Sequence, residues 1–482
     1  MAKYDLAIKG ATVVIPVHGE IKADIGIVGE KIAAIADIIP EENCERVIDA
    51  SGKYVFPGAI DSHSHVGIYR PLDEDAKSES ASAALGGVTT IMSYFRTGKS
   101  YLNKVGGFKE IFPELIALSE KAFITDYAYH IALMTSEQLK EIDWLVSECG
   151  VTTFKYYMFY KSIDLAGSSK GSGYLMLDDN ALDFGFLYRF MKEVARVNKQ
   201  YKDTGGVRLS IHCENPEIIK ATVAEVQANS SGNTLRDYSN GRPGWQEELA
   251  IKEAAIIANQ TDCPVNLLHL TSKEAIDAGK EMAQAYPHLD ILLESTLHHL
   301  ALSHEDDYGI LGKVNPPIRT REDVDYLWKA VAEGYIDTAV SDHATSSKEF
   351  KKGDLWNAMP GFGGFSLMFP VIITEGYHKR GVSLKRLAEI SAYYPAVYHH
   401  LYPRKGTIMV GSDADLAIID LENEKEATLE NIHSAQDFSP FEGLMLKGWP
   451  ETTVLRGKVI FENGQVIGKP GYGTYLKRPP KK

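Results

Sequence analysis

The feature that most restricts the fold of this 482-residue chain is a repeated pairing of a short apolar segment with a side chain that can bind metal. The apolar segments 151–154, 207–211, 265–268 and 338–341 are followed directly by Lys155, His212, His269 and Asp342. The stretches 186–198 and 245–259 between them carry apolar residues at helical intervals, so strands and helices alternate as in an α/β protein. Parallel strands that present such side chains at their C-terminal ends are typical of a TIM (β/α)8 barrel, where those ends form the active site.

The segment Asp61-Ser62-His63-Ser64-His65 adds two candidate ligands to this series. It follows the apolar run 55–60, which we expect to form one buried strand. Because successive side chains of a strand point to opposite faces, His63 and His65 lie on the same side and can bind one cation. A single histidine after a strand is more often a core residue than a ligand, and a single aspartate there is commonly a helix cap. Their joint occurrence at five places favours a metal site.

Both ends of the chain contain short segments that read as strands. The N-terminal set covers residues 4–9, 23–28 and 31–35, and the C-terminal set covers 415–420, 454–462 and 465–467, with Asn463-Gly464 as a strong hairpin turn. Neither end has enough strands for a core of its own, so we expect the two ends to pair. The predicted division is a composite β-sandwich domain over residues 1–55 and 405–470, a catalytic TIM-barrel domain over 56–404, and a C-terminal tail over 471–482.

Several segments of the chain resemble the cyclic amidohydrolases, the group of hydantoinase, dihydropyrimidinase, allantoinase and dihydroorotase. They are residues 57–65, 154–160, 212–215, 268–272, 313–319, 341–343 and 402–416. The resemblance covers almost the whole chain, and its motifs are specific for the group rather than for one of its members. It implies a TIM barrel with a small β-sandwich beside it.

The resemblance also implies two divalent metal ions at the barrel mouth. Five side chains would bind them: His63, His65 and Asp342 the first ion, and His212 and His269 the second. Lys155 would be carboxylated by carbon dioxide, and its carbamate would bridge the ions. A lysine in a desolvated cavity has a lowered pKa, so its neutral amine can react. Imidazole and carboxylate ligands suit zinc, which we expect first, and also manganese or iron.

A site of this kind implies hydrolysis of a cyclic amide. Two metal ions about 3.5–4 Å apart lower the pKa of a shared water, and the hydroxide would attack the ring carbonyl carbon. Tyr160 matches a family tyrosine whose hydroxyl stabilises the oxyanion, with core packing in a tyrosine-rich stretch as the alternative. Asp342 would take the proton of the attacking water and pass it to the leaving ring nitrogen.

Fewer residues bear on the choice of ring. Tyr160 favours the hydantoinase and dihydropyrimidinase branch, whereas Asn315, which precedes two prolines, resembles the dihydroorotase pattern and could bind an imide or ureide edge through its amide. The dihydroorotase arginine, expected two residues past the second metal histidine, is replaced by Gly67, and Arg70 is out of register. The missing arginine argues against a carboxylated ring such as dihydroorotate, unless Arg70 takes its place. A hydantoin- or dihydropyrimidine-like ring is therefore the predicted substrate, with allantoinase- or dihydroorotase-like ring opening as the alternative.

Two segments at the predicted barrel mouth depart from the hydantoinase pattern. Gly361 lies in the segment 359–366, whose glycines would let the backbone approach the substrate. The loop 161–179 is rich in serine and glycine, and a loop over a barrel mouth often selects the substrate. These departures leave the shape of the substrate pocket open.

Charge and hydropathy bear on the partners of the chain. A net charge of −14 argues against a nucleic-acid or anionic-membrane partner. No apolar stretch reaches the ~20 residues of a membrane span, and no signal peptide is indicated, so we expect a cytoplasmic enzyme with a small-molecule cyclic amide substrate. The resemblance implies a homotetramer or homodimer. Two other classes on the same barrel stay open: a non-catalytic scaffold that has lost metal ligands, and a different hydrolase such as an esterase or deaminase.

Overall fold

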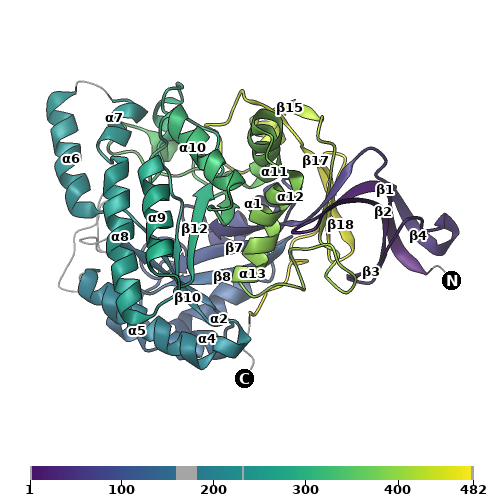
Figure 1. Cartoon of the computed structure of the whole chain (residues 1–482), viewed down its shortest axis with the longest axis horizontal. Helices are drawn as coiled ribbons and strands as arrows, with labels where there is room; N and C mark the ends of the chain where they lie inside the picture. Colours follow the sequence, from purple (N-terminus) through teal and green to yellow (C-terminus); the bar gives the residue numbers. More distant parts are fainter. Residues whose placement is uncertain (1–2, 159–181, 231–232, 479–482) are drawn as a thin grey trace.

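The computed structural model describes residues 3–158, 182–230 and 233–478, which form a barrel and a second sheet beside it (Figure 1). The barrel is an eight-stranded parallel sheet whose strands neighbour one another in chain order. They are β6 (Ala59–Ser64), β7 (Val88–Arg96), β8 (Asp126–Ala132), β9 (Thr153–Tyr157), β10 (Arg208–His212), β11 (Val265–Leu267), β12 (Ile291–Thr296) and β13 (Thr338–Val340). Every residue of these strands is buried, as expected for parallel strands that are covered on both faces.

The first and last strands of this sheet meet and nearly close the barrel. The amide of His65 donates to the carbonyl of His343 at 2.7 Å, and Ser64 and His343 form a parallel bridge. The buried carboxylate of Asp61 accepts a hydrogen bond from the amide of Ser341 at 3.2 Å. These contacts join β6 to the segment after β13, and the predicted TIM barrel is confirmed.

Helices alternate with the barrel strands and cover the outside of the barrel (Figure 1). The longer ones are α1 (Leu72–Leu85), α2 (Phe108–Ser119), α5 (Phe184–Gln200), α6 (Pro216–Asn229), α8 (Gly244–Thr261), α9 (Lys273–Ala285) and α10 (Arg321–Ala332). The shorter ones are α3 (Ser136–Leu139), α4 (Ile142–Ser147), α7 (Leu235–Asn240), α11 (Met368–Val371), α12 (Leu384–Ala388), α13 (Tyr394–Tyr398) and α14 (Leu429–Ile432), with π-helical turns η7 (Ile372–His378) and η8 (Glu389–Tyr393) between α11 and α13. The helices predicted over 186–198 and 245–259 are confirmed as α5 and α8.

Helix α5 shows why such a segment is helical and how it binds to the barrel. The side chain of Asp183 caps the helix by accepting from the amide of Phe186 at 2.8 Å, which stabilises a helix by about 1 kcal/mol. Phe186, Phe190 and Val194 recur at helical spacing and are buried. The ring of Phe190 lies 6.2 Å from that of Phe154 on β9, so this apolar face packs directly on the barrel.

The second sheet contains strands from both ends of the chain. Its order is β19-β18-β17-β14-β5-β1-β2-β3, with β4 paired to β1. The strands are β1 (Tyr4–Ile15), β2 (Gly19–Val28), β3 (Lys31–Ala36), β4 (Cys44–Asp49), β5 (Tyr54–Pro57), β14 (Leu416–Ile419), β17 (Pro450–Leu455), β18 (Lys458–Glu462) and β19 (Gln465–Val466), while β15 (Glu424–Glu426) and β16 (Met445–Lys447) form a separate pair. Ile8, Leu416 and Val454 belong to one buried apolar cluster of this part. The predicted small β-domain built from both chain ends is confirmed, and hydrogen bonds join its strands in one continuous sheet.

The apolar run 55–60 is divided between the two sheets, so the prediction of one buried strand there is wrong. Strand β5 pairs with β1 and β14, whereas β6 pairs with β7. Gly58 lies between them, where a Cβ atom would come within 2.3 Å of Thr89, and its amide donates to the carbonyl of Asp415 at 2.8 Å. The apolar pattern does not reveal this junction, because residues on both sides of it are buried.

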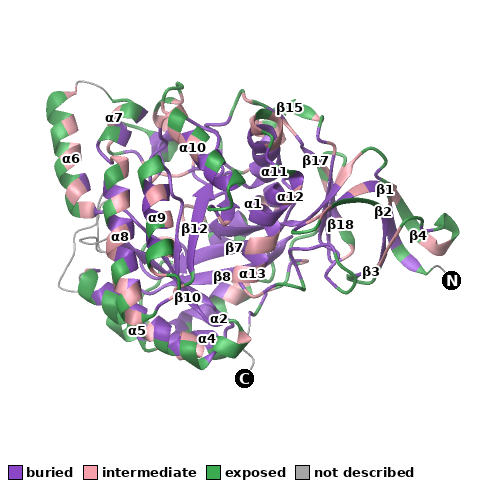
Figure 2. Ribbon diagram, viewed as in Figure 1, coloured by how far each residue is buried: buried purple, intermediate pink, exposed green. Residues whose placement is uncertain are grey.

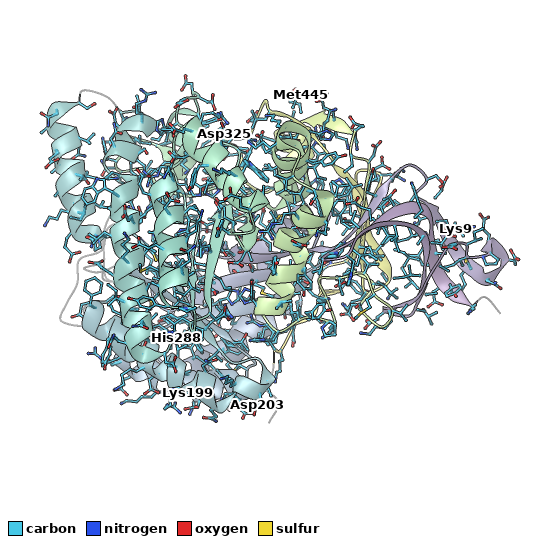
Figure 3. The ribbon with its side chains drawn as sticks, viewed as in Figure 1. Lys9, Lys199, Asp203, His288, Asp325 and Met445 are labelled. Carbon is cyan, nitrogen blue, oxygen red and sulfur yellow. The ribbon has the colours of Figure 1, made fainter. Side chains whose placement is uncertain are left out.

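Exposed and buried residues are divided between the outer helices and the barrel strands. Figure 2 shows exposed residues along the outer helices, such as α6, and buried residues in the barrel strands. Lys199 on α5 and Asp325 on α10 lie at the periphery of the ribbon (Figure 3). Helices α11 and α12 lie between the barrel and the second sheet (Figure 1). Within the described ranges, no helix combines the length and the apolar character needed to cross a membrane.

The described end of the tail packs against the barrel of the same chain. The amide of Leu476 donates to the carbonyl of Tyr127 at 2.7 Å. Arg478 is fully buried and donates to the carbonyl of Tyr129 at 2.5 Å. Both acceptors lie on β8, so the tail covers the end of the barrel at which its strands begin.

Candidate metal centre

The six predicted metal-site residues lie at the C-terminal side of the barrel strands. His63 and His65 are at the end of β6, Lys155 is in β9, His212 ends β10, and His269 and Asp342 lie just past β11 and β13. Because the strands are parallel, all of these positions face the same end of the barrel. Asn215 and Ser272 cap α6 and α9 shortly after the two separate histidines, so short loops hold those ligands in place.

His63, His65 and Asp342 form one compact group. Oδ1 of Asp342 lies 3.2 Å from Nε2 of His63 and 3.2 Å from Nε2 of His65. One ligand atom from each residue lies within 4.8 Å of the others. Two imidazoles and a carboxylate at such separations are suited to hold one divalent cation.

His212 and His269 form a neighbouring pair. Their ring centroids are 4.3 Å apart, and the ring of His269 lies 5.5 Å from that of His63. Both ring nitrogens of His269 are buried and make no hydrogen bond to any described residue. A buried imidazole without a hydrogen-bond partner calls for an explanation, and a metal ion fits both its position and its chemistry.

Two carboxylates that sequence reasoning missed orient these histidines. Oε1 of Glu294 lies 2.7 Å from Nδ1 of His63, which directs Nε2 of this ring towards Asp342. Oε2 of Glu214 lies 2.7 Å from Nε2 of His212. Burial by itself raises the pKa of Glu214, but the Arg242 guanidinium and His212 lower it to about 2. Glu214 is therefore an acceptor, which places the proton of His212 on Nε2 and the lone pair on Nδ1.

Lys155 lies between the two groups of histidines. Its Nζ is 3.5 Å from Nε2 of His63, and it lies 4.4 Å from the ring centroid of Tyr94 and 4.9 Å from that of Tyr157. Burial lowers the pKa of Lys155 to about 8, against the opposing charges of Asp342 and Glu294. A larger share of the amine is therefore neutral near physiological pH than in an exposed lysine.

The backbone at two of the ligand positions is strained. His269 and Asp342 have φ angles of 39° and 49°, in the left-handed region that non-glycine residues seldom adopt. Such a conformation costs of order 1–3 kcal/mol and persists only where the surrounding structure imposes it. The amide of Leu270 donates to the carbonyl of Glu294 at 2.8 Å, which holds the segment after His269 against β12. Strain of this kind is typical of functional sites.

A cavity of about 970 Å³ opens onto the metal-site residues. Asn315 and Gly361, predicted to contact substrate, both line it. The side-chain oxygen of Asn315 accepts from the hydroxyl of Tyr238. The amide of Gly361, at φ 99°, donates to the carbonyl of Lys313 at 3.0 Å. The structure thus brings these two residues together with the ligands.

Other residues weighed from the sequence are placed differently. Arg70 lines the same cavity, but its guanidinium is paired with Asp75 at 3.1 Å, so it is engaged within the protein. Gly67 donates its amide to the same aspartate at 2.7 Å. Tyr160 and the loop 161–179 lie outside the described residues.

The sequence model of the amidohydrolase family matches residues 181–460. The chain belongs to the amidohydrolase family. Members generally bind a divalent metal ion, and the group of His63, His65 and Asp342 in this amidohydrolase is suited to hold one.

Relatives that match over almost the whole chain show to which group of amidohydrolases this protein is similar. It is 31% identical to an L-hydantoinase of Paenarthrobacter aurescens, over 98% of each chain. It is 30% identical to an allantoinase of Desulfitobacterium hafniense (strain Y51), over 99% of each chain. A solved structure of L-hydantoinase (dihydropyrimidinase) from Arthrobacter aurescens has a TM-score of 0.85 and 29% identity, and the match covers 98% of this chain and 99% of that one. The resemblance to cyclic amidohydrolases is confirmed.

Proposed function

We propose that this amidohydrolase opens the amide bond of a cyclic imide or ureide, with a hydantoin- or dihydropyrimidine-like ring as its substrate. The observation that carries the proposal is the convergence of His65, His212, His269, Lys155 and Asp342 on one cavity. A cavity of this size accommodates a small ring with its substituents. The relatives named hydantoinase support the choice of ring.

We assign the two groups of ligands to two divalent metal ions. His63, His65 and Asp342 would hold one, and His212 and His269 the other. The position of Lys155 next to His63, and its lowered pKa, support its carboxylation to a bridging carbamate. Bound ions would supply hydroxide near neutral pH and polarise the ring carbonyl. We expect zinc at both positions, although manganese and iron suit the same ligands.

Asp342 is the residue of this chain to which we assign proton transfer. Its carboxylate lines the cavity and lies between His63 and His65. It takes a proton from the attacking water and gives it to the ring nitrogen as the C–N bond breaks, which avoids an unstable amide anion as the leaving group.

Three residues would position and stabilise the ring. Tyr238 occupies the side-chain oxygen of Asn315, so the amide group of Asn315 is the part that can donate to a ring carbonyl. Gly361 lets the backbone approach the ring without a side chain. Tyr160 is assigned by sequence match alone to the hydrogen bond that stabilises the oxyanion.

The experiment that tests the proposal is a ring-opening screen with metal-loaded protein. The panel contains hydantoin, 5-phenylhydantoin, dihydrouracil, allantoin, dihydroorotate and succinimide. We expect opening of the hydantoins or of dihydrouracil. Activity confined to allantoin or dihydroorotate would support the alternative choice of ring, and no activity on any compound of the panel with two metals bound would reject this ring class.

Product analysis separates the proposal from the other reactions of the fold. Ring opening yields a new carboxylate and retains the nitrogen, whereas a deaminase releases ammonia. A metal content near zero after purification would identify a non-catalytic scaffold. The homodimer or homotetramer and the cytoplasmic location stay predictions, which light scattering and cell fractionation test.

A further inference from the structure

Arg96 lies at the barrel mouth, beside the metal centre. It is the last residue of β7 and therefore points to the same side as Tyr94, two residues earlier. The ring of Tyr94 lies inside the barrel, 4.7 Å from the ring of His63 and 4.4 Å from Nζ of Lys155. Arg96 lies one step further towards the mouth and lines the same cavity as the ligands.

One aromatic ring separates Arg96 from a metal ligand. The guanidinium carbon lies 5.6 Å from the ring centroid of Tyr101, and the hydroxyl of Tyr101 is 3.0 Å from Nδ1 of His65. Nη1 of Arg96 donates to the carbonyls of Thr97 and Lys99 at 3.3 and 2.7 Å. These contacts hold the guanidinium in one orientation at the edge of the metal site.

The other edge of this guanidinium has no protein partner in the part of the chain that the structure describes. Nη1 makes both carbonyl hydrogen bonds, while Nε and Nη2 donate to no described residue. Nε and Nη2 form the fork that binds the two oxygens of a carboxylate side by side. The hydrogen bonds to the loop therefore account for one nitrogen of Arg96 and leave its carboxylate-binding edge unexplained.

The charges around the cavity also leave Arg96 without a negative partner. Arg96 is only 7% exposed, yet among the described residues no carboxylate forms an ion pair with it. Arg70 and Lys352, which also line the cavity, are paired with Asp75 and Glu349. A guanidinium stays charged at any physiological pH, and burying a charge without a partner is costly. A ligand that brings a negative charge removes this cost.

We propose that Nε and Nη2 of Arg96 bind a carboxylate carried by the substrate, so that the preferred substrates are cyclic imides or ureides with an acidic substituent. This inference rests on the proposed ring opening and specifies its substrate class. Lys313, which also lines the cavity, is engaged within the protein instead, because it donates to the carbonyl of Trp356 at 3.0 Å. Arg96 is thus assigned to specificity and not to the chemical step.

A matched pair of rings tests the inference. Hydantoin-5-acetate and its primary amide differ in charge but hardly in shape. With metal-loaded wild-type protein we expect kcat/KM to be about 10- to 100-fold higher for the acid, as a charge-assisted bidentate contact provides. In Arg96→Gln the ratio of kcat/KM for the acid to that for the amide should fall to about 1, mainly through a higher KM for the acid. Arg70→Gln, which removes a cation already paired with Asp75, is the matched control and keeps the preference.

The outcomes separate this inference from the ring-opening function itself. Equal use of both rings by the wild type, or an equal loss for both in Arg96→Gln, would overturn the role of Arg96 and leave ring opening in place. If neither ring is opened, calorimetry with the same pair decides: acid-selective binding that Arg96→Gln removes supports the anion site, and its absence rejects it. Should Arg96→Gln not fold, Arg96→Lys keeps the charge without the fork and is expected to lower the ratio of kcat/KM for the acid to that for the amide.

Discussion

The lowered pKa of Lys155 makes a quantitative prediction for how metal-free protein regains its metal centre. Carbon dioxide reacts with the neutral amine, so the rate of carboxylation follows the neutral fraction. With a pKa of about 8, roughly 9% of Lys155 is neutral at pH 7 and about 91% at pH 9. An unperturbed lysine would be neutral to about 0.04% and about 4% at the same two pH values. Reactivation should therefore rise about tenfold from pH 7 to 9 and then level off, instead of rising about a hundredfold without a plateau.

The assay is reactivation of chelator-stripped protein, with dissolved carbon dioxide and free zinc held constant at each pH. Activity on hydantoin reports recovery, and a carbamate resonance from labelled carbon dioxide in a ¹³C NMR spectrum reports the modification. The buried histidines add no step in this window, because burial holds the pKa values of His63 and His269 well below their usual value. Lys155→Ala is the control and should show no carbamate at any pH. A rate that keeps rising in proportion to hydroxide up to about pH 10, or reactivation without a carbamate signal, would refute the reasoning.

Three further substitutions test other parts of the argument. Lys155→Ala should lose both metal and activity, with partial rescue by short carboxylic acids, and full activity in this variant would contradict a bridging role. Glu294→Ala, which frees a ligand histidine from its orienting carboxylate, should weaken metal binding about 10- to 100-fold in a chelator competition, and an unchanged affinity would count against that role. Lys405→Met should lower the free energy of unfolding in urea by about 3–5 kcal/mol, because the buried lysine lies 2.6 Å from the carboxylate of Asp415, which forms no other ion pair among the described residues. A loss below about 1 kcal/mol would show that the carboxylate finds another partner or is neutralised.

The positions of the candidate ligand side chains could be predicted from the sequence for two reasons. Metal binding limits the residue types, and a parallel barrel limits useful positions to the ends of its strands. His212 and His269 each follow an apolar segment and precede a helix cap by a few residues. The residues on either side of each histidine are therefore enough to predict its place in the fold. The same reasoning placed Asn315 and Gly361 at the barrel mouth, where both line the cavity.

Residues whose role depends on distant partners could not be predicted in this way. Glu294 and Arg96 are charged residues in wholly buried strands, and a charge at such a position indicates a functional or paired group. The sequence does not show which group each of them faces. Glu294 reaches His63 only because the barrel brings β12 and β6 around one axis. The division of the apolar run at Gly58 was missed for a related reason, since burial continues while the identity of the neighbouring strand changes.

The interleaving of the two chain ends has a consequence for synthesis of the protein. Strand β5 lies between β1 and β14, and β14 begins only at Leu416, after the whole barrel has been made. Until then one edge of β5, which carries the apolar side chains of Val55 and Phe56, has no partner strand. Such an edge can pair with strands of other chains. Docking of the two ends is a contact of very large sequence separation and is expected to be slow. Nascent chains interrupted before Leu416 should therefore aggregate through this edge instead of yielding a partly active barrel.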